Sequence, residues 1–208
     1  FNMGLNNFNA AKSKLKILKY LSYKTKSFNN YFFALGAILQ KKVEEGEYEY
    51  ALVNAREMEQ EAIRLNNHVG IIQGKLVMAN YYLAQDNKRE AIALYKEISQ
   101  STNASHDDKL MSLLFVYYIA NEMGDYNMAL NYLNASKIEV NKYILVNKMT
   151  SRSQNAFDLL LIEIYYCDLY ANMRDAEGMR SHIDSMDVYY YSDNTSNNFY
   201  GEYHGEKA

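Results

Sequence analysis

A spaced pattern of glycine, tyrosine and alanine recurs along this chain. Residues 44–55 read EEGEYEYALVNA and residues 122–133 read EMGDYNMALNYL, so the three residue types keep the same spacing in both stretches. When the alanine is taken as an anchor, the equivalent positions lie 40, 40 and 38 residues apart, followed by a longer gap of 50. The five anchors are Ala11, Ala51, Ala91, Ala129 and Met179. A period of this length predicts an array of similar units that stack on one another.

Each unit reads as two helices joined by a short turn. Apolar residues follow helical spacing on both sides of a polar break. Gly46 and Gly124 stand where the first helix must end, because glycine takes the left-handed conformation without a steric penalty. Asp125 is suited to cap the next helix, and the small anchors allow the two helices to approach closely. The chain contains no proline, which favours uninterrupted helices. The sequence therefore predicts an all-α protein of antiparallel helix hairpins.

Three segments carry the fuller pattern: VMANYYLAQDNKREAIALY, FVYYIANEMGDYNMALNYL and, more loosely, LGAILQKKVEEGEYEYALVNA. This pattern resembles the tetratricopeptide repeat family. A fourth segment, YYCDLYANMRDAEGMRSHI, departs from it because Ala176 and Met179 replace the tyrosine and alanine. The units are also longer than the family's usual length of about 34 residues. The resemblance implies a right-handed superhelix of helix hairpins.

On this reading the whole chain is one repeat array. The expected units are a partial repeat at 5–28, full repeats at 30–66, 68–101, 109–149 and 156–187, and the start of a further repeat at 198–208. Polar loops are expected at 101–108 and 150–155. Because both outer units are incomplete, we expect the chain to be part of a longer protein.

The resemblance also implies a binding groove, since the first helices of the family line a concave surface that holds a peptide. The matching positions are Gln40, Gln73, Leu76, Asn80, Leu83, Met111, Leu114, Tyr118, Asn121 and Asp168, together with Phe33, Val43, Leu161, Ile164 and Asn172. Asn80 matches a position whose asparagine can hold a peptide backbone. Leu76 and Leu114 stand where a lysine would clamp a terminal carboxylate, so a ligand of that kind is not expected. The alternative is that the apolar members of this set are core residues.

Chemical motifs are sparse. His68, His106, His182 and His204 have no partner at metal-ligand spacing, and each is expected at the surface or in a loop. No phosphate-binding glycine loop, nucleophile elbow or zinc-protease motif occurs. Cys167 falls at a small, buried repeat position, which predicts a packed thiol. We therefore predict no catalytic residue, no metal and no cofactor.

Charge is unevenly distributed, although the net charge is only −3. Residues 1–30 hold six lysines and no acid, whereas residues 158–208 hold ten acids and three basic residues. Leucines alternate with the lysines at helical spacing, so the basic stretch is expected to be a solvated helix face rather than a nucleic-acid site. No apolar run is long enough to span a membrane. A single cysteine fits either the cytoplasm or the periplasm.

These features favour a protein-interaction module that binds a peptide or partner segment and is not itself an enzyme. Its composition is similar to the repeat regions of bacterial regulators with a histidine kinase or helix-turn-helix output, some of them periplasmic sensors. The alternative is an all-α enzyme or small-molecule pocket walled by Tyr189, Tyr190, Tyr191 and Tyr200. A homodimer through stacked end faces is also expected, since an array cut within its repeats exposes apolar ends.

Overall fold

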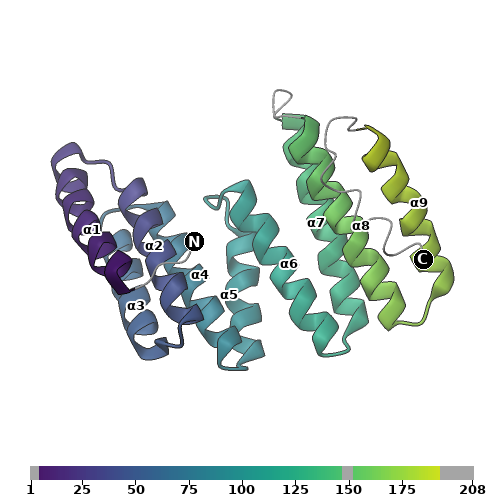
Figure 1. The fold of residues 1–208 in the computed structure, drawn as a ribbon, viewed down its shortest axis with the longest axis horizontal. Helices are drawn as coiled ribbons and strands as arrows, with labels where there is room; N and C mark the ends of the chain where they lie inside the picture. The colour runs from purple at the N-terminus through teal and green to yellow at the C-terminus, as the bar shows by residue number, and fades with distance from the viewer. Residues whose placement is uncertain (1–4, 147–151, 193–208) are drawn as a thin grey trace. The chain divides into compact units, whose positions relative to one another are not determined.

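The computed structural model describes residues 5–146 and 152–192, and nearly all of this part of the chain is helical (Figure 1). Its helices are α1 (Leu5–Thr25), α2 (Asn29–Glu44), α3 (Tyr48–Arg64), α4 (His68–Ala84), α5 (Lys88–Gln100), α6 (His106–Glu122), α7 (Tyr126–Val146), α8 (Arg152–Asn172) and α9 (Ala176–Ser192). No strand occurs among these residues. The predicted all-α class is confirmed for the part described.

One type of turn ends six of these helices. Gly46 and Gly124 take φ angles of 81° and 73°, so both left-handed turns predicted from glycine are confirmed. At the end of α6 the Asp125 N–H donates to the Ala120 carbonyl at 2.9 Å, as in a Schellman motif. The same left-handed conformation occurs at Lys26, Asn66, Asp86 and Arg174. Glycine is therefore only one of the residue types that take this left-handed conformation at the ends of helices in this chain.

Side-chain caps define where several helices begin. Asp125 Oδ1 accepts a hydrogen bond from the Met128 N–H at 3.0 Å, which confirms the predicted cap of α7. Asp175 caps α9 in the same way by accepting from the Gly178 N–H at 3.0 Å. Each aspartate satisfies a backbone donor that has no partner inside its own helix.

Helix α6 begins at His106, three residues before the predicted start of its repeat at 109. Ser105 explains the difference, because its Oγ accepts from the Asp108 N–H at 3.1 Å and donates to the Asp108 carboxylate at 2.7 Å. This reciprocal cap and the acidic first turn stabilise the helix N-terminus. The predicted polar loop at 101–108 is therefore shorter than expected.

Helix α8 begins at Arg152, inside the loop predicted at 150–155. The stretch RSQN contains no glycine or proline and is compatible with a first helical turn. The further repeat predicted at 198–208 lies outside the described residues. So do Tyr200 and the side chains of Tyr189, Tyr190 and Tyr191, which were expected to wall a small-molecule pocket.

The structure divides into two compact units, residues 1–115 and 116–208. In the described part of the first unit, α3 packs on α2 and α4, and α4 also packs on α2 and α5. Phe32, Leu39, Met58 and Val77 form its interior and are at most 1% exposed. The anchors Ala51 and Ala91 are fully buried, as predicted for positions of close helix approach.

The contact between α3 and α4 depends on a second small residue. A methyl group at Gly70 would lie 2.6 Å from Ala62 Cβ and 2.7 Å from the Phe32 ring. These distances are too short for carbon atoms in contact, so a glycine is required where α4 crosses α3.

In the second unit, α8 packs on α7 and α9. The anchor Ala129 and the large side chains Leu133, Ile162 and Leu169 are at most 1% exposed. The interior also holds Glu163, whose side chain is fully buried.

Glu163 joins the three helices of this unit. Lys137 on α7 donates to Glu163 Oε1 at 2.5 Å, and His182 Nδ1 on α9 contacts Glu163 Oε2. The His182 ring also stacks on Tyr166, with ring centroids 4.2 Å apart. The prediction of a surface histidine is therefore wrong for His182, because the helical register of α9 turns it towards α8.

Candidate functional site

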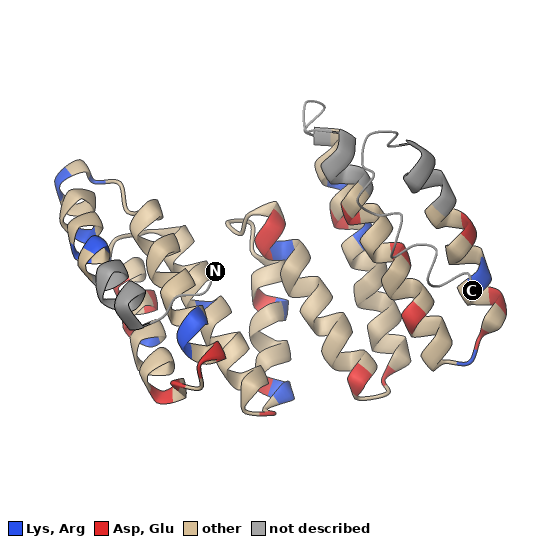
Figure 2. Cartoon of the chain, viewed as in Figure 1, with Lys and Arg blue, Asp and Glu red and all other residues tan. Residues whose placement is uncertain are grey.

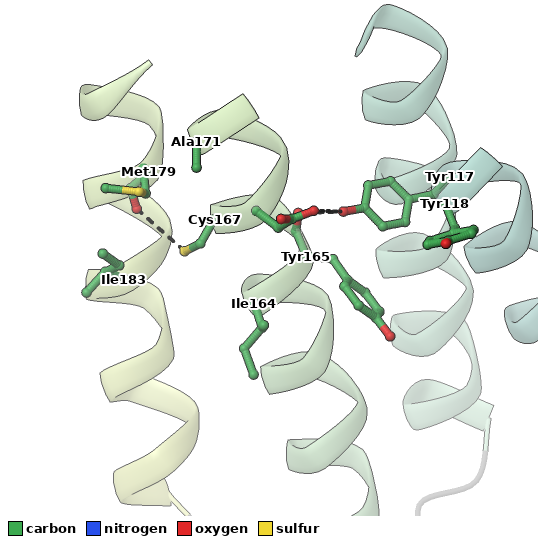
Figure 3. Close-up of a pocket in the computed structure, with 9 residues that line it drawn as sticks. Tyr117, Tyr118, Ile164, Tyr165, Cys167, Ala171, Met179 and Ile183 are labelled. Atoms are coloured by element: carbon green, nitrogen blue, oxygen red, sulfur yellow. Dashed lines mark hydrogen bonds between the residues drawn. The ribbon is translucent and has the colours of Figure 1, made fainter. Parts of the chain in front are cut away.

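A hollow of about 580 Å³ opens between α6, α8 and α9 in the second unit (Figure 3). Its volume is in the usual range of ligand pockets, about 300–1,000 Å³. The residues that line it are Tyr117 and Tyr118 from α6, Ile164, Tyr165, Cys167, Asp168 and Ala171 from α8, and Met179 and Ile183 from α9. Most of this surface is apolar or aromatic, and Asp168 is the one carboxylate among the lining residues.

The α9 side of the hollow is apolar (Figure 3). Ile164, Met179 and Ile183 are half-buried and pack against the buried core residues beneath them. The Cys167 thiol is buried and donates to the Met179 carbonyl at 3.7 Å. The predicted burial of Cys167 is thus confirmed, and this side offers an apolar surface to a ligand.

The α6 side of the hollow carries an ordered polar group. Asp168 Oδ2 accepts hydrogen bonds from the Tyr117 hydroxyl at 3.1 Å and from Asn121 Nδ2 at 2.9 Å. Asn121 is oriented in turn by Asn172, which donates to its Oδ1 at 3.3 Å. The structure therefore brings together three residues that the sequence assigned to a groove: Asn121, Asp168 and Asn172.

The Tyr117 hydroxyl stays protonated and can donate a hydrogen bond to Asp168. Burial raises the pKa of its phenol far above the ordinary value of 10.0, and the negative charge of Asp168 raises it further. The hydroxyl thus keeps its proton and fixes the carboxylate of Asp168 in one orientation.

Two further tyrosines complete the α6 side. Tyr118 is 50% exposed and donates to Glu122 at 2.6 Å, which holds its ring at the rim. Tyr165 is half-buried, and its ring centroid lies 5.3 Å from that of Tyr117. Tyr118 was predicted as a groove residue, and it lines the same hollow as Asp168.

The predicted groove residues of the first unit form a different arrangement. Asn80 Nδ2 donates to Gln40 at 2.6 Å, and Asn80 Oδ1 accepts from the hydroxyl of the buried Tyr95. These bonds connect α2, α4 and α5. Gln73 likewise donates to Asp108 at 3.3 Å, which links α4 to α6. The amides predicted to face a ligand are thus engaged with their neighbours.

The apolar groove positions of the first unit vary in exposure. Met111 and Phe33 are 49% and 47% exposed. Leu76 packs against the buried side chains of Ile72, Ile98 and Ala104. The remaining apolar positions are half-buried or buried: Leu83, Leu114 and Val43.

Several lining residues were not among the predicted groove positions. Tyr117 and Cys167 occupy a repeat position that was interpreted as buried, and Met179 and Ile183 belong to the second helix of their unit. For Ile183, the sequence signal is the residue type four positions after the anchor, which is tyrosine at Tyr95 but isoleucine at Ile183.

The described residues contain no group of three or more histidine, cysteine, aspartate or glutamate side chains placed to hold a metal ion. None of the helices in the described ranges has the length and apolarity that crossing a bilayer would require. The pocket offers apolar contact, aromatic faces and one anchored carboxylate, which suits non-covalent binding. Comparisons with protein-family models, curated proteins and solved structures found no match to this chain.

Proposed function

We propose that this chain is a protein-interaction module of the tetratricopeptide type, which binds an extended segment of a partner protein. The observation that carries the proposal is the hollow between α6, α8 and α9, with tyrosines on one side and apolar side chains on the other. Tyrosine is enriched among the residues that dominate binding at protein interfaces, because its ring buries a large area at a small entropic cost.

The repeat pattern and the local packing support the same proposal. In the first unit, α4 contacts both helices of the preceding hairpin, as expected where hairpins stack on their neighbours. The recurring left-handed turn gives the hairpins a common geometry. We propose that the hairpins continue as a right-handed superhelix, and that the module serves a larger bacterial signalling or regulatory protein.

A selection from a displayed library of random peptides tests this function. Peptides that are enriched on the purified protein are synthesised and their affinities are measured by calorimetry. The exposed residue Ala171 lines the hollow, so Ala171→Trp fills the site and should weaken binding at least tenfold. Ala84→Trp, also on an exposed alanine near the end of a helix, is the matched control and should bind normally. Equal affinity for both variants, or no enriched peptide, would contradict the proposal.

A small-molecule site is the second candidate, and the volume of the hollow is the observation that favours it. A panel of metabolites screened by thermal shift separates the two functions. A metabolite that raises the melting temperature of the parent but not of Ala171→Trp would favour the small-molecule site over a peptide groove.

A further inference from the structure

The carboxylate of Asp168 has binding capacity that its neighbours do not use. Both of its hydrogen bonds, from Tyr117 and from Asn121, reach Oδ2. Among the described residues, no side chain donates to Oδ1 and no lysine or arginine forms an ion pair with Asp168. A carboxylate oxygen accepts up to two hydrogen bonds, so Oδ1 can receive a donor from a ligand.

This oxygen is held in place before a ligand arrives. The Tyr117 hydroxyl shares its single proton between Asp168 Oδ2 and the Tyr165 carbonyl, each at 3.1 Å, and both acceptors belong to α8. Tyr117 is 2% exposed, which leaves it little freedom to move. A group that is already ordered loses little entropy when it binds, and its interaction contributes more to affinity.

The aromatic rings near Asp168 suit a cation. Figure 3 shows Tyr118 and Tyr165 on the α6 side of the hollow, with Ile164 and Ile183 on the side of α9. Tyrosine faces attract an ammonium or guanidinium group electrostatically, while a neutral group gains no such attraction and an anion is repelled. The apolar residues can receive the methylene stem of a long cationic side chain.

The charge of the surrounding chain favours the same ligand. No lysine or arginine lines the hollow. Residues 158–186 hold six acids and two basic residues, a net charge of −4, and acidic residues lie along α8 and α9 in Figure 2. A partner segment with positive charge would therefore be attracted to this face, and an acidic segment would be repelled.

We infer that the hollow selects a partner segment by one lysine or arginine side chain, whose cation binds Asp168 Oδ1 between the Tyr118 and Tyr165 rings. This specificity rests on the proposed function. The residues beside the cation in the partner segment are apolar and contact Ile164, Met179 and Ile183.

Capped fluorescent peptides of the form Ser-Leu-X-Leu-Ser, without terminal charges, test the inference by anisotropy. X is lysine, arginine, norleucine or glutamate, so the peptides share their length and apolar content. The lysine and arginine peptides should bind at least tenfold more tightly than the norleucine peptide, and the glutamate peptide most weakly. Asp168→Asn, which keeps an acceptor for Tyr117, should reduce the difference between lysine and norleucine to less than twofold.

Asp184→Asn is the matched control, because Asp184 is an exposed acid of α9 that does not line the hollow. It should preserve the preference for lysine. Equal binding of all four peptides would overturn the cation specificity and leave the peptide groove standing, whereas no binding by any peptide would contradict both. Binding of n-butylammonium alone with the affinity of the lysine peptide would identify a small-amine site and overturn the inference.

Discussion

The two units place a polar side chain at the same position of the repeat and use it differently. Asn80 in the first unit and Asp168 in the second each lie eleven residues before their anchor. Asn80 is bonded to Gln40 and to Tyr95, so its amide is occupied by neighbouring helices. Asp168 is exposed and has one oxygen free of described partners.

The difference follows from the residue four positions after the anchor. In the first unit this residue is Tyr95, which is fully buried and donates its hydroxyl to Asn80. In the second unit it is Ile183, which has no hydroxyl and lines the hollow. The first hairpin thus has a hydroxyl that bonds the polar side chain at this repeat position, whereas Ile183 offers none. The comparison teaches that residues at one repeat position differ in how many of their polar atoms the neighbouring helices bond.

The largest expected effect concerns the acidic residues that connect helices in each unit. Glu163→Ala should lower the free energy of unfolding by about 3 kcal/mol, because it removes a fully buried side chain that both Lys137 and His182 contact. Glu61→Ala in the first unit should cost about 1 kcal/mol, since its partners Lys19 and Tyr23 lie near solvent. Urea unfolding measures both. Equal losses would contradict the assignment of Glu163 as the main polar contact of the second unit.

The second prediction concerns the contact between Tyr95 and Asn80 in the first unit. Tyr95→Ile should lower the free energy of unfolding by about 3 kcal/mol, because it removes a buried ring and leaves Asn80 Oδ1 without its donor. Tyr95→Phe removes only the hydroxyl and should cost about 1 kcal/mol. If the two variants unfold at the same denaturant concentration, packing of the Tyr95 ring does not contribute to the stability of this hairpin.

The third prediction compares two left-handed turns, where a substitution should change the free energy of unfolding by about 1 kcal/mol. Gly124→Ala should destabilise the protein by about 1 kcal/mol, because φ is positive there and no atom within 4 Å would obstruct the new methyl group. Arg174→Gly should stabilise it by a similar amount, since Arg174 adopts φ 57° despite its side chain. Thermal unfolding of both variants measures the two shifts. Shifts in the same direction would contradict the strain assigned to Arg174.

The smallest expected effect depends on pH. Burial raises the pKa of Tyr95 above its ordinary 10.0, and burial together with Asp168 raises that of Tyr117. The unfolded chain therefore loses these protons first, so stability is complete below pH 10 and falls as the pH rises towards the folded values. At pH 10 each tyrosine should cost about 0.4 kcal/mol. Tyr117→Phe should flatten this slope in urea titrations at successive pH values, and an unchanged slope would contradict the role of Tyr117.

Much of the fold could be predicted from the sequence. The spacing of Gly46 and Gly124 from their anchors located two turns, and Asp125 located a cap, because these features depend on local backbone chemistry. The left-handed turn at Arg174 could not be predicted, since its residue type disfavours that conformation and the hairpin imposes it. The early start of α6 also depends on a cap by Ser105, which competes with the loop-like composition around it.

The site was less predictable than the fold. The resemblance to the repeat family assigned Tyr118, Asn121 and Asp168 to one groove, and the structure brings them together. The hollow, however, is lined by residues of three helices, and the sequence does not show which amides are already bonded. Asn80 and Asp168 look alike in the repeat pattern, and only the surrounding packing distinguishes them. The partnered position of His182 likewise depends on contact between α8 and α9.

One double variant tests the central claim most directly. Asp168→Asn together with Ile183→Tyr gives the second unit the asparagine and tyrosine that are hydrogen-bonded in the first unit as Asn80 and Tyr95. Titration of this variant with the lysine peptide should show affinity reduced at least tenfold, while its urea unfolding midpoint stays equal to that of the parent or rises. Parental affinity for the lysine peptide in the double variant would contradict the claim that Ile183 and Asp168 open this repeat to a ligand.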